Sequence, residues 1–210
     1  LNPIRLEHQS VDDVTHSVVE TEDGKLEERT NTIFSPQEFV VNIGPQHPAT
    51  HGVLRLRTSL DGETVKKIDV YCGYVHRGIE KLCESLTYPQ TLHFADRLDY
   101  LSAQQNRHAV CLCIEDALQV EVPARAQYIR TIMDELMRIS SHLLFWSTFC
   151  MDLGGTTAFF YGFRDREKIL DIFEETCGAR MTFNYYTIGG LMADLHPDFQ
   201  RKVKEFCAYM

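Results

Sequence analysis

The 210-residue sequence contains no long hydrophobic run, because Arg, Asp, Glu or His interrupts every apolar stretch. None of these stretches reaches the roughly 18–20 residues that a membrane-spanning helix needs. Basic residues are also scarce, with 21 Lys and Arg against 30 Asp and Glu and a formal net charge of −9. Surfaces that bind nucleic acid or anionic lipid are basic. The sequence therefore predicts a chain without a membrane span and without a nucleic-acid partner.

Cysteines are present, but no Cys-x-x-Cys pair occurs among the seven. The N-terminal residues lack the basic and apolar regions of a secretory signal, which favours reduced thiols packed as small hydrophobic groups. Cys111 and Cys113 are two residues apart in a predicted helix and so point about 200° apart around its axis. They cannot share a metal ion, and we expect no metal site in this chain.

Charge and hydrophobic period divide the sequence into three parts. Residues 1–35 hold eight acidic and three basic side chains and no sustained period, which predicts an extended acidic arm or linker. Residues 36–75 alternate between apolar and polar around an Asp61-Gly62 turn, which predicts a small antiparallel sheet. Residues 76–210 shift toward a period of 3.6 and predict a helical bundle, truncated at Met210 where the pattern stops without a cap. Together these parts indicate an α+β fold in a piece of a longer polypeptide.

The helical part contains one long pattern and several shorter ones, separated by Tyr88-Pro89, Val122-Pro123 and two Gly-Gly pairs. The long pattern follows Pro123 and predicts a helix with one apolar face. That face comprises Tyr128, Ile132, Leu136, Ile139, Leu143, Trp146 and Cys150. The shorter helices are expected over 79–86, 99–118, 164–176 and 199–210.

The loop from Asn42 to Gly52 carries two histidines, His47 and His51, between Gly and Pro residues. Loops on a rigid scaffold commonly present ligand-binding side chains, and imidazole exchanges protons near neutral pH. A zinc site of the His-Glu-x-x-His type is excluded, because Pro48 opposes a helix and no Glu follows His47. The residues alone leave two interpretations open: an imidazole that stabilises a tight loop, or one that contacts a ligand.

Two further polar clusters border the predicted helices. Residues 96–100, Asp-Arg-Leu-Asp-Tyr, are expected to open a helix, where carboxylates are favoured and can pair with Arg97. Tyr100 is either a phenol donor or a buried tyrosine with a local partner. Asp152 ends the long helix, where a carboxylate is unfavourable unless a cationic or imidazole partner compensates it.

A series of motifs runs from about Phe39 to Leu195 in this order: NIGPQHPATHGVLRL, GYVHRGIEKL, DRLDYL, PARAQYIR, ELMRISSHL, DLGGTTAFFYGFRDREKI, GARM and IGGL. The series resembles the D subunit, the 49-kDa type, of respiratory complex I, the NADH:quinone oxidoreductase. The resemblance implies that the chain is the N-terminal part of such a protein. The acidic residues 1–35 resemble the stretch that joins the C and D subunits in fused versions.

The family's fold is similar to the large subunit of nickel–iron hydrogenases, in which an R-x-C-G-x-C motif begins the metal site. From Arg97 onward, this chain has Asp99 and Ser102 at the thiolate positions of that motif. A carboxylate and a hydroxyl do not replace soft thiolates. The resemblance therefore implies an organic substrate in place of the metal.

In the family that substrate is a quinone. The resemblance implies that His51 and Tyr100 hold its head group and that Asp152 pairs with His51. An imidazolium and a phenol can stabilise the negative charge that develops on the carbonyl oxygens and can deliver protons. His47 and Thr50, in the same loop as His51, are further candidates for binding the quinone.

The resemblance also implies that electrons come from a [4Fe–4S] cluster on the neighbouring B subunit, and that this chain alone holds no cofactor. Arg77 matches the family segment near that cluster; alternatively it is a surface arginine that pairs with Glu80 or Glu84. Many family members carry a histidine after GARM, where this chain has Thr182. That departure suits a cluster of lower potential working with menaquinone.

We therefore expect a quinone-binding core subunit of a proton-translocating NADH:quinone oxidoreductase, inactive in isolation. The expected partners are the B, C and I subunits and the H subunit of the membrane arm. The expected location is peripheral, on the cytoplasmic face of a bacterial plasma membrane or the matrix face of the inner mitochondrial membrane. The alternative is a non-catalytic scaffold protein in a related membrane-bound oxidoreductase or in an energy-converting hydrogenase-like complex.

Overall fold

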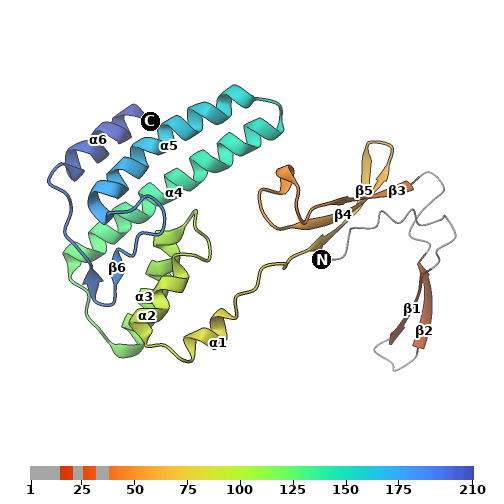
Figure 1. Ribbon diagram of the computed structural model, residues 1–210, viewed down its shortest axis with the longest axis horizontal. Coiled ribbons are helices and arrows are strands. Elements are labelled where there is room, and N and C mark those ends of the chain that lie inside the picture. The colour runs from red at the N-terminus through yellow and green to blue at the C-terminus, as the bar shows by residue number, and fades with distance from the viewer. Residues whose placement is uncertain (1–14, 21–25, 32–37) are drawn as a thin grey trace. The chain divides into compact units, whose positions relative to one another are not determined.

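The computed structural model describes residues 15–20, 26–31 and 38–210. The chain divides into two compact units, one ending at Arg77 and the other beginning at Gly78. The first unit contains strands and one short 3₁₀ helix, and the second is mainly helical (Figure 1). The predicted α+β class, with a small antiparallel sheet followed by helices, is confirmed. The similarity to hydrogenases stays a prediction.

The sheet of the first unit has three antiparallel strands in the order β3-β4-β5. The strands are β3 (Glu38–Ile43), β4 (Arg55–Asp61) and β5 (Thr64–Tyr71). Asp61 pairs with Thr64 across the β4–β5 turn, and Gly62 adopts a φ of 60° there, a left-handed conformation that favours glycine. Among residues 39–77, only Thr58 and Ser59 are buried, so the sheet leaves apolar side chains such as Val70 exposed.

The acidic segment contains a second strand pair. Strand β1 (Thr15–Glu20) pairs antiparallel with β2 (Leu26–Asn31), in a register that joins Thr15 to Asn31. The sequence predicted an extended arm without naming these strands. The other residues of the segment lie outside the described part of the chain, so its role as an arm stays a prediction.

The second unit is built from six helices and one short hairpin within residues 78–210. The helices are α1 (Ile79–Cys83), α2 (Tyr88–Ala95), α3 (Ala103–Leu118), α4 (Ala124–Asp152), α5 (Thr156–Cys177) and α6 (Phe199–Tyr209). The hairpin pairs β6 (Tyr186–Thr187) with β7 (Gly190–Leu191). Helices α4 and α5 lie side by side, and α6 packs on α5 (Figure 1). None of these helices is long and apolar enough to cross a bilayer.

The core of the second unit lies between α3, α4 and α5 and includes the aromatic side chains that follow α5. Met133, Ile169 and Phe173 are completely buried, and Tyr186 of β6 is buried with them. Helices α4 and α5 approach closely at Gly162, where an added Cβ would meet the Ser147 hydroxyl at 1.8 Å. A glycine therefore fits this helix crossing, and a larger residue would have to displace the Ser147 side chain.

Several sequence predictions about the helical part are wrong. The break expected at Tyr88-Pro89 is the start of α2, because Pro is tolerated in the first turn and Thr87 forms a capping box with Gln90. The helix expected from residue 99 begins at Ala103, and the one expected from residue 164 begins at Thr156. Strands were expected to end near Tyr71, but β6 and β7 follow α5.

The buried face of α4 also differs from the predicted apolar face. Tyr128 is 74% exposed and Trp146 is 45% exposed, whereas Leu136 belongs to both the predicted and the observed face. The buried residues of α4 are Ala126, Ile129, Arg130, Met133, Leu136, Met137, Ser140 and Ser147. The helix therefore has a second, exposed apolar stripe.

Candidate functional site

The loop between β3 and β4 is held at its base by close backbone contact. Gly44 has a φ of 89°, and a Cβ on it would lie 1.8 Å from the carbonyl oxygen of Leu54. Across the same base, Arg55 donates from Nε and Nη2 to Asn42 Oδ1, at 3.2 and 3.1 Å. Arg55 also stacks over the Tyr71 ring. These contacts fix where the loop leaves and re-enters the sheet.

Within the loop, the candidate residues hold one another in a single turn of 3₁₀ helix, Pro48–Thr50. His47 Nδ1 accepts the Ala49 N–H at 3.1 Å and so caps this turn. The Thr50 hydroxyl lies 2.8 Å from the His47 carbonyl oxygen and 2.9 Å from that of Gly52. His51 follows in the left-handed conformation, with φ of 47°. His47 therefore has the loop-stabilising role that the sequence left open, and its Nδ1 is occupied.

The loop encloses a shallow hollow of about 440 Å³, lined mainly by apolar atoms. Its lining residues are Pro45, Gln46, His47, Pro48, His51, Gly52 and Val53. Both imidazoles are exposed at this hollow. A concave apolar surface with a few polar groups is the usual form of a small-molecule site.

Residues 96–100 form a turn between α2 and α3 and do not open a helix as predicted. Asp96 caps the C-terminal end of α2 and pairs with Arg107 at 3.0 Å, not with Arg97. Arg97 instead donates to the His93 carbonyl oxygen. Asp99 Oδ1 accepts the Leu101 N–H at 3.1 Å. Arg97 therefore acts on this cluster through its charge, which works to lower the pKa of Asp96.

Tyr100 lies in that turn and is 52% exposed, so the alternative of a buried tyrosine is excluded for the described chain. Asp152 is the last residue of α4 and is exposed. It stands at the negative end of the helix dipole, as the sequence predicted. Arg77 is also exposed and is the last residue of the first unit. Glu84, one of the two partners suggested for Arg77, pairs with Lys81.

The structure brings together three of the candidate residues, His47, Thr50 and His51, in one loop of the first unit. Tyr100 and Asp152 lie in the second unit. A joint site of His51, Tyr100 and Asp152 therefore stays a prediction.

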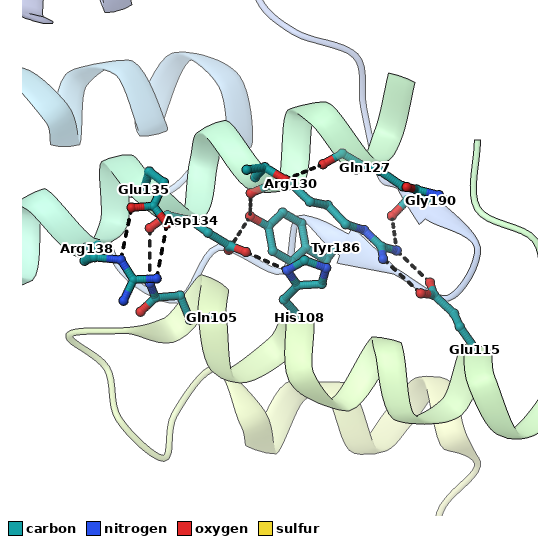
Figure 2. Close-up of polar contacts among 11 residues, drawn as sticks. Gln105, His108, Glu115, Gln127, Arg130, Asp134, Glu135, Arg138, Tyr186 and Gly190 are labelled. Atoms are coloured by element: carbon teal, nitrogen blue, oxygen red, sulfur yellow. Dashed lines mark hydrogen bonds and ion pairs between the residues drawn. The ribbon is translucent and has the colours of Figure 1, made fainter. Parts of the chain in front are cut away.

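A group of buried and half-buried side-chain pairs in the second unit was not predicted from the sequence. Arg130 and Glu115 form a bidentate pair at 2.7 and 2.9 Å, with side chains only 1% and 4% exposed. His108 Nδ1 lies 2.5 Å from Asp134 Oδ2, and Tyr186 donates to the other oxygen of Asp134 at 2.8 Å (Figure 2). These partners are 15 to 52 positions apart in sequence, so no local motif reveals them.

Burial and hydrogen bonding shift the pKa values of several groups in and around these pairs. Burial raises the pKa of Glu115, but the bonds from Arg130 and the Gly189 N–H outweigh it and leave that pKa below its usual value. Burial raises the pKa of Asp96 despite the neighbouring Arg107. Burial also raises the thiol pKa of Cys111 to about 11 and that of Cys177 to about 12. No group of three or more His, Cys, Asp or Glu able to hold a metal ion occurs in the described residues.

Comparison with known proteins first identifies a protein family that part of the chain matches. Residues 152–210 match the family described as respiratory-chain NADH dehydrogenase, 49 Kd subunit.

The relatives are more specific. The whole chain is 65% identical to the C/D subunit of NADH-quinone oxidoreductase from Phocaeicola vulgatus and covers 40% of that protein. Identity to the C/D subunit of the Bacteroides fragilis enzyme is 63%, covering 39% of it. Over 174 residues, 83% of the chain, it is 47% identical to the D subunit of the Bacillus anthracis enzyme and covers 48% of that protein.

These matches confirm the resemblance found in the sequence, and they fit a D-type segment of a fused C/D polypeptide. The chain spans less than half the length of the curated relatives named here.

Proposed function

We propose that the chain is part of the quinone site of a proton-translocating NADH:quinone oxidoreductase. Its relatives carry the name NADH-quinone oxidoreductase, and identity of 65% over the whole chain supports a shared activity. The observation that carries the proposal is the β3–β4 loop, whose base and turn are fixed while His51 faces an apolar hollow.

Reduction of a quinone needs two electrons and two protons, and negative charge develops on its two carbonyl oxygens. A protonated His51 imidazole at one oxygen and the Tyr100 phenol at the other would stabilise this charge and supply protons. Asp152 would pair with His51 and favour the protonated imidazole. His47 takes a positioning role, because its Nδ1 caps the turn that ends directly before His51.

Thr50 fixes the same turn through its hydroxyl, and its side chain is half-buried rather than open to a ligand. We assign it a positioning role as well. Arg77 would lie toward the [4Fe–4S] cluster of a neighbouring B subunit and place a positive charge near it. Electrons would enter from that cluster, and Thr182 would leave it without the imidazole that many family members supply.

The remaining parts of the proposal concern assembly. The chain would contact partners of the B, C and I types and the membrane-arm H subunit. It would be peripheral, on the cytoplasmic face of a bacterial plasma membrane. In this arrangement the apolar hollow would receive the quinone from the membrane side.

The test uses His51→Asn and Tyr100→Phe in the assembled enzyme. Asn tolerates the left-handed backbone of residue 51, and Phe keeps the aromatic ring while removing the hydroxyl. Loss of a general acid slows a reaction by about 10²–10⁴-fold, so each variant should reduce quinone at least about a hundredfold more slowly. Reduction of the iron–sulfur clusters by NADH should stay at the wild-type rate. The matched control is Tyr128→Phe, on the exposed side of α4.

If the two residues act as one unit, the double variant should lose little beyond the slower single variant. Wild-type quinone turnover in both single variants would overturn the assigned roles. A photoreactive quinone analogue adds a direct readout, because labelling of residues 45–53 is expected. Labelling of other polypeptides of the complex alone would favour a scaffold role for this chain.

A further inference from the structure

Arg166 lies in the middle of α5, on the side of this helix that packs against α4. It comes one turn after Gly162 and one turn before Leu170, and both of these residues are buried. Residues four apart share one face of a helix. Gly162 approaches Ser147 of α4, so this face of α5 is directed toward α4. The Arg166 side chain is half-buried there, and its Nε atom is fully buried.

No described residue accepts a hydrogen bond from the buried Nε of Arg166. The two carboxylates that flank it in sequence are bound elsewhere, because Asp165 pairs with Arg164 and Glu167 pairs with Arg180. Burial lowers the pKa of Arg166, the charge of Glu167 raises it, and the charge of Arg180 lowers it. The net effect is a lowered pKa, so the neighbouring carboxylates do not compensate the cation for its lost hydration.

The buried arginines of the same unit show how such a cation is normally satisfied. Arg107 pairs with Asp96, and Arg130 pairs with Glu115. Burying a charge is costly unless it is paired and hydrogen-bonded, and Arg166 departs from this rule. The group that matches it best is a carboxylate, because two carboxylate oxygens fit the planar fork of a guanidinium.

Two aromatic rings precede Arg166 on the same flank of α5. Phe159 and Phe163 are each half-buried, and their ring centroids are 4.4 Å apart. Their spacing of four and then three residues places both rings in one stripe with Arg166. Apolar surface that stays partly open marks a place where other polypeptide binds. A segment that covers this stripe with apolar side chains and brings one acidic side chain to Arg166 would complement it in shape and in charge.

We propose that Arg166 binds the carboxylate of an aspartate or glutamate from the remainder of the same polypeptide, in a segment that covers Phe159 and Phe163. The chain spans 40% of a C/D relative and 48% of a D-subunit relative, so more than half of each relative lies outside the matched part. An arginine desolvated against α4 would destabilise the polypeptide before assembly if its counter-charge came from a separate subunit. The contact does not depend on the quinone site proposed above.

The first test is cross-linking of Arg166→Lys, in the full-length polypeptide within its assembled enzyme. A carbodiimide joins a lysine amine to a carboxylate that it contacts, and mass spectrometry identifies the joined peptides. We expect a product, absent from the wild type, that joins position 166 to an Asp or Glu of the same polypeptide outside residues 1–210. The matched control is Arg201→Lys, which should be joined to Glu205 of its own helix. Coupling of position 166 only to other carboxylates, or no coupling while the control product forms, would overturn the proposal.

The second test is the sign of the stability change in Arg166→Met, measured as the midpoint of thermal unfolding of the same assembled enzyme. Removal of one partner from a buried ion pair leaves the other charge uncompensated, so the midpoint should fall by at least about 3 °C. Arg201→Met, which removes an exposed pair, should leave the midpoint unchanged. If the Arg166 guanidinium met only water, its replacement would remove a desolvated charge. The midpoint would then stay the same or rise, and the proposal would be wrong.

Discussion

The buried guanidinium of Arg130 is surrounded by four acceptor oxygens. It donates to both oxygens of Glu115 and to the carbonyl oxygens of Thr187 and Gly190. Arg130→Met should lower the free energy of unfolding by about 3–5 kcal/mol, because it leaves Glu115 buried without its counter-charge. Urea unfolding measures this loss. Arg138→Met, which removes an exposed pair with Glu135, should leave the free energy of unfolding nearly unchanged, because exposed ion pairs contribute little to stability. Equal losses in the two variants would contradict the prediction.

Glu115 should also contribute to acid sensitivity. Its pKa is lowered in the folded protein, so its stabilising contribution is complete above the ordinary glutamate value of about 4.3. That contribution is lost as the pH falls through the lowered value, because the carboxylate then takes up a proton. We expect the free energy of unfolding to fall less between pH 6 and pH 3 in Glu115→Gln than in wild type. Parallel pH profiles for the two proteins would show that Glu115 has no such role.

At the scale of elements, Gly162 sets the separation between α4 and α5. An added methyl group would meet the Ser147 hydroxyl, which itself donates to the Leu143 carbonyl oxygen. Gly162→Ala should therefore cost about 1–3 kcal/mol, the usual range for overpacking. In a Ser147→Gly background the same change should cost at least about 1 kcal/mol less, because the obstructing atom is gone. Gly190→Ala is the control, since no atom lies within 4 Å of its added Cβ. If the effects of Gly162→Ala and Ser147→Gly on the free energy of unfolding were simply additive, Ser147 would not be the obstruction and the helices could move apart to admit the methyl group.

Helix α4 illustrates what hydrophobic period can and cannot predict. Its length and type were predicted, but the chosen stripe contains Tyr128 and Ile132, which are 74% and 40% exposed. The buried stripe runs through Ile129 and Met133 instead. Both stripes are apolar, so the period identifies the helix while only the position of its partner decides which stripe is buried.

The sheet was predicted more closely than the helices, because alternation and the Asp61-Gly62 turn indicate adjacent antiparallel strands. Its register, which shifts between Ser59 and Leu60, was not predicted. The candidate site was predicted only in part. The His47–His51 loop was found from its Gly and Pro residues, but the capping role of His47 depends on side-chain geometry. The side-chain pairs of His108 and Tyr186 were not predicted, because their partners lie 26 and 52 or more positions away and share no motif with them. Such pairs exist only once the helices have packed.

At the scale of the whole molecule, large apolar side chains gather where α4 ends and α5 begins. Phe145, Phe149, Leu153 and Phe160 are each more than half exposed. Exposed groups of this kind mark surfaces that bind other proteins or cause association. The 210-residue chain, produced by itself, should therefore self-associate at micromolar concentration, as sedimentation velocity would measure. Phe149→Ser with Phe160→Ser should shift it toward monomer without lowering the free energy of unfolding, because neither side chain is in the core. Leu112→Ser, an exposed site on α3, is the control and should leave association unchanged. A wild-type chain that stays monomeric would contradict the prediction. If the Phe149→Ser, Phe160→Ser double variant associated as strongly as Leu112→Ser, the contact would belong to another surface.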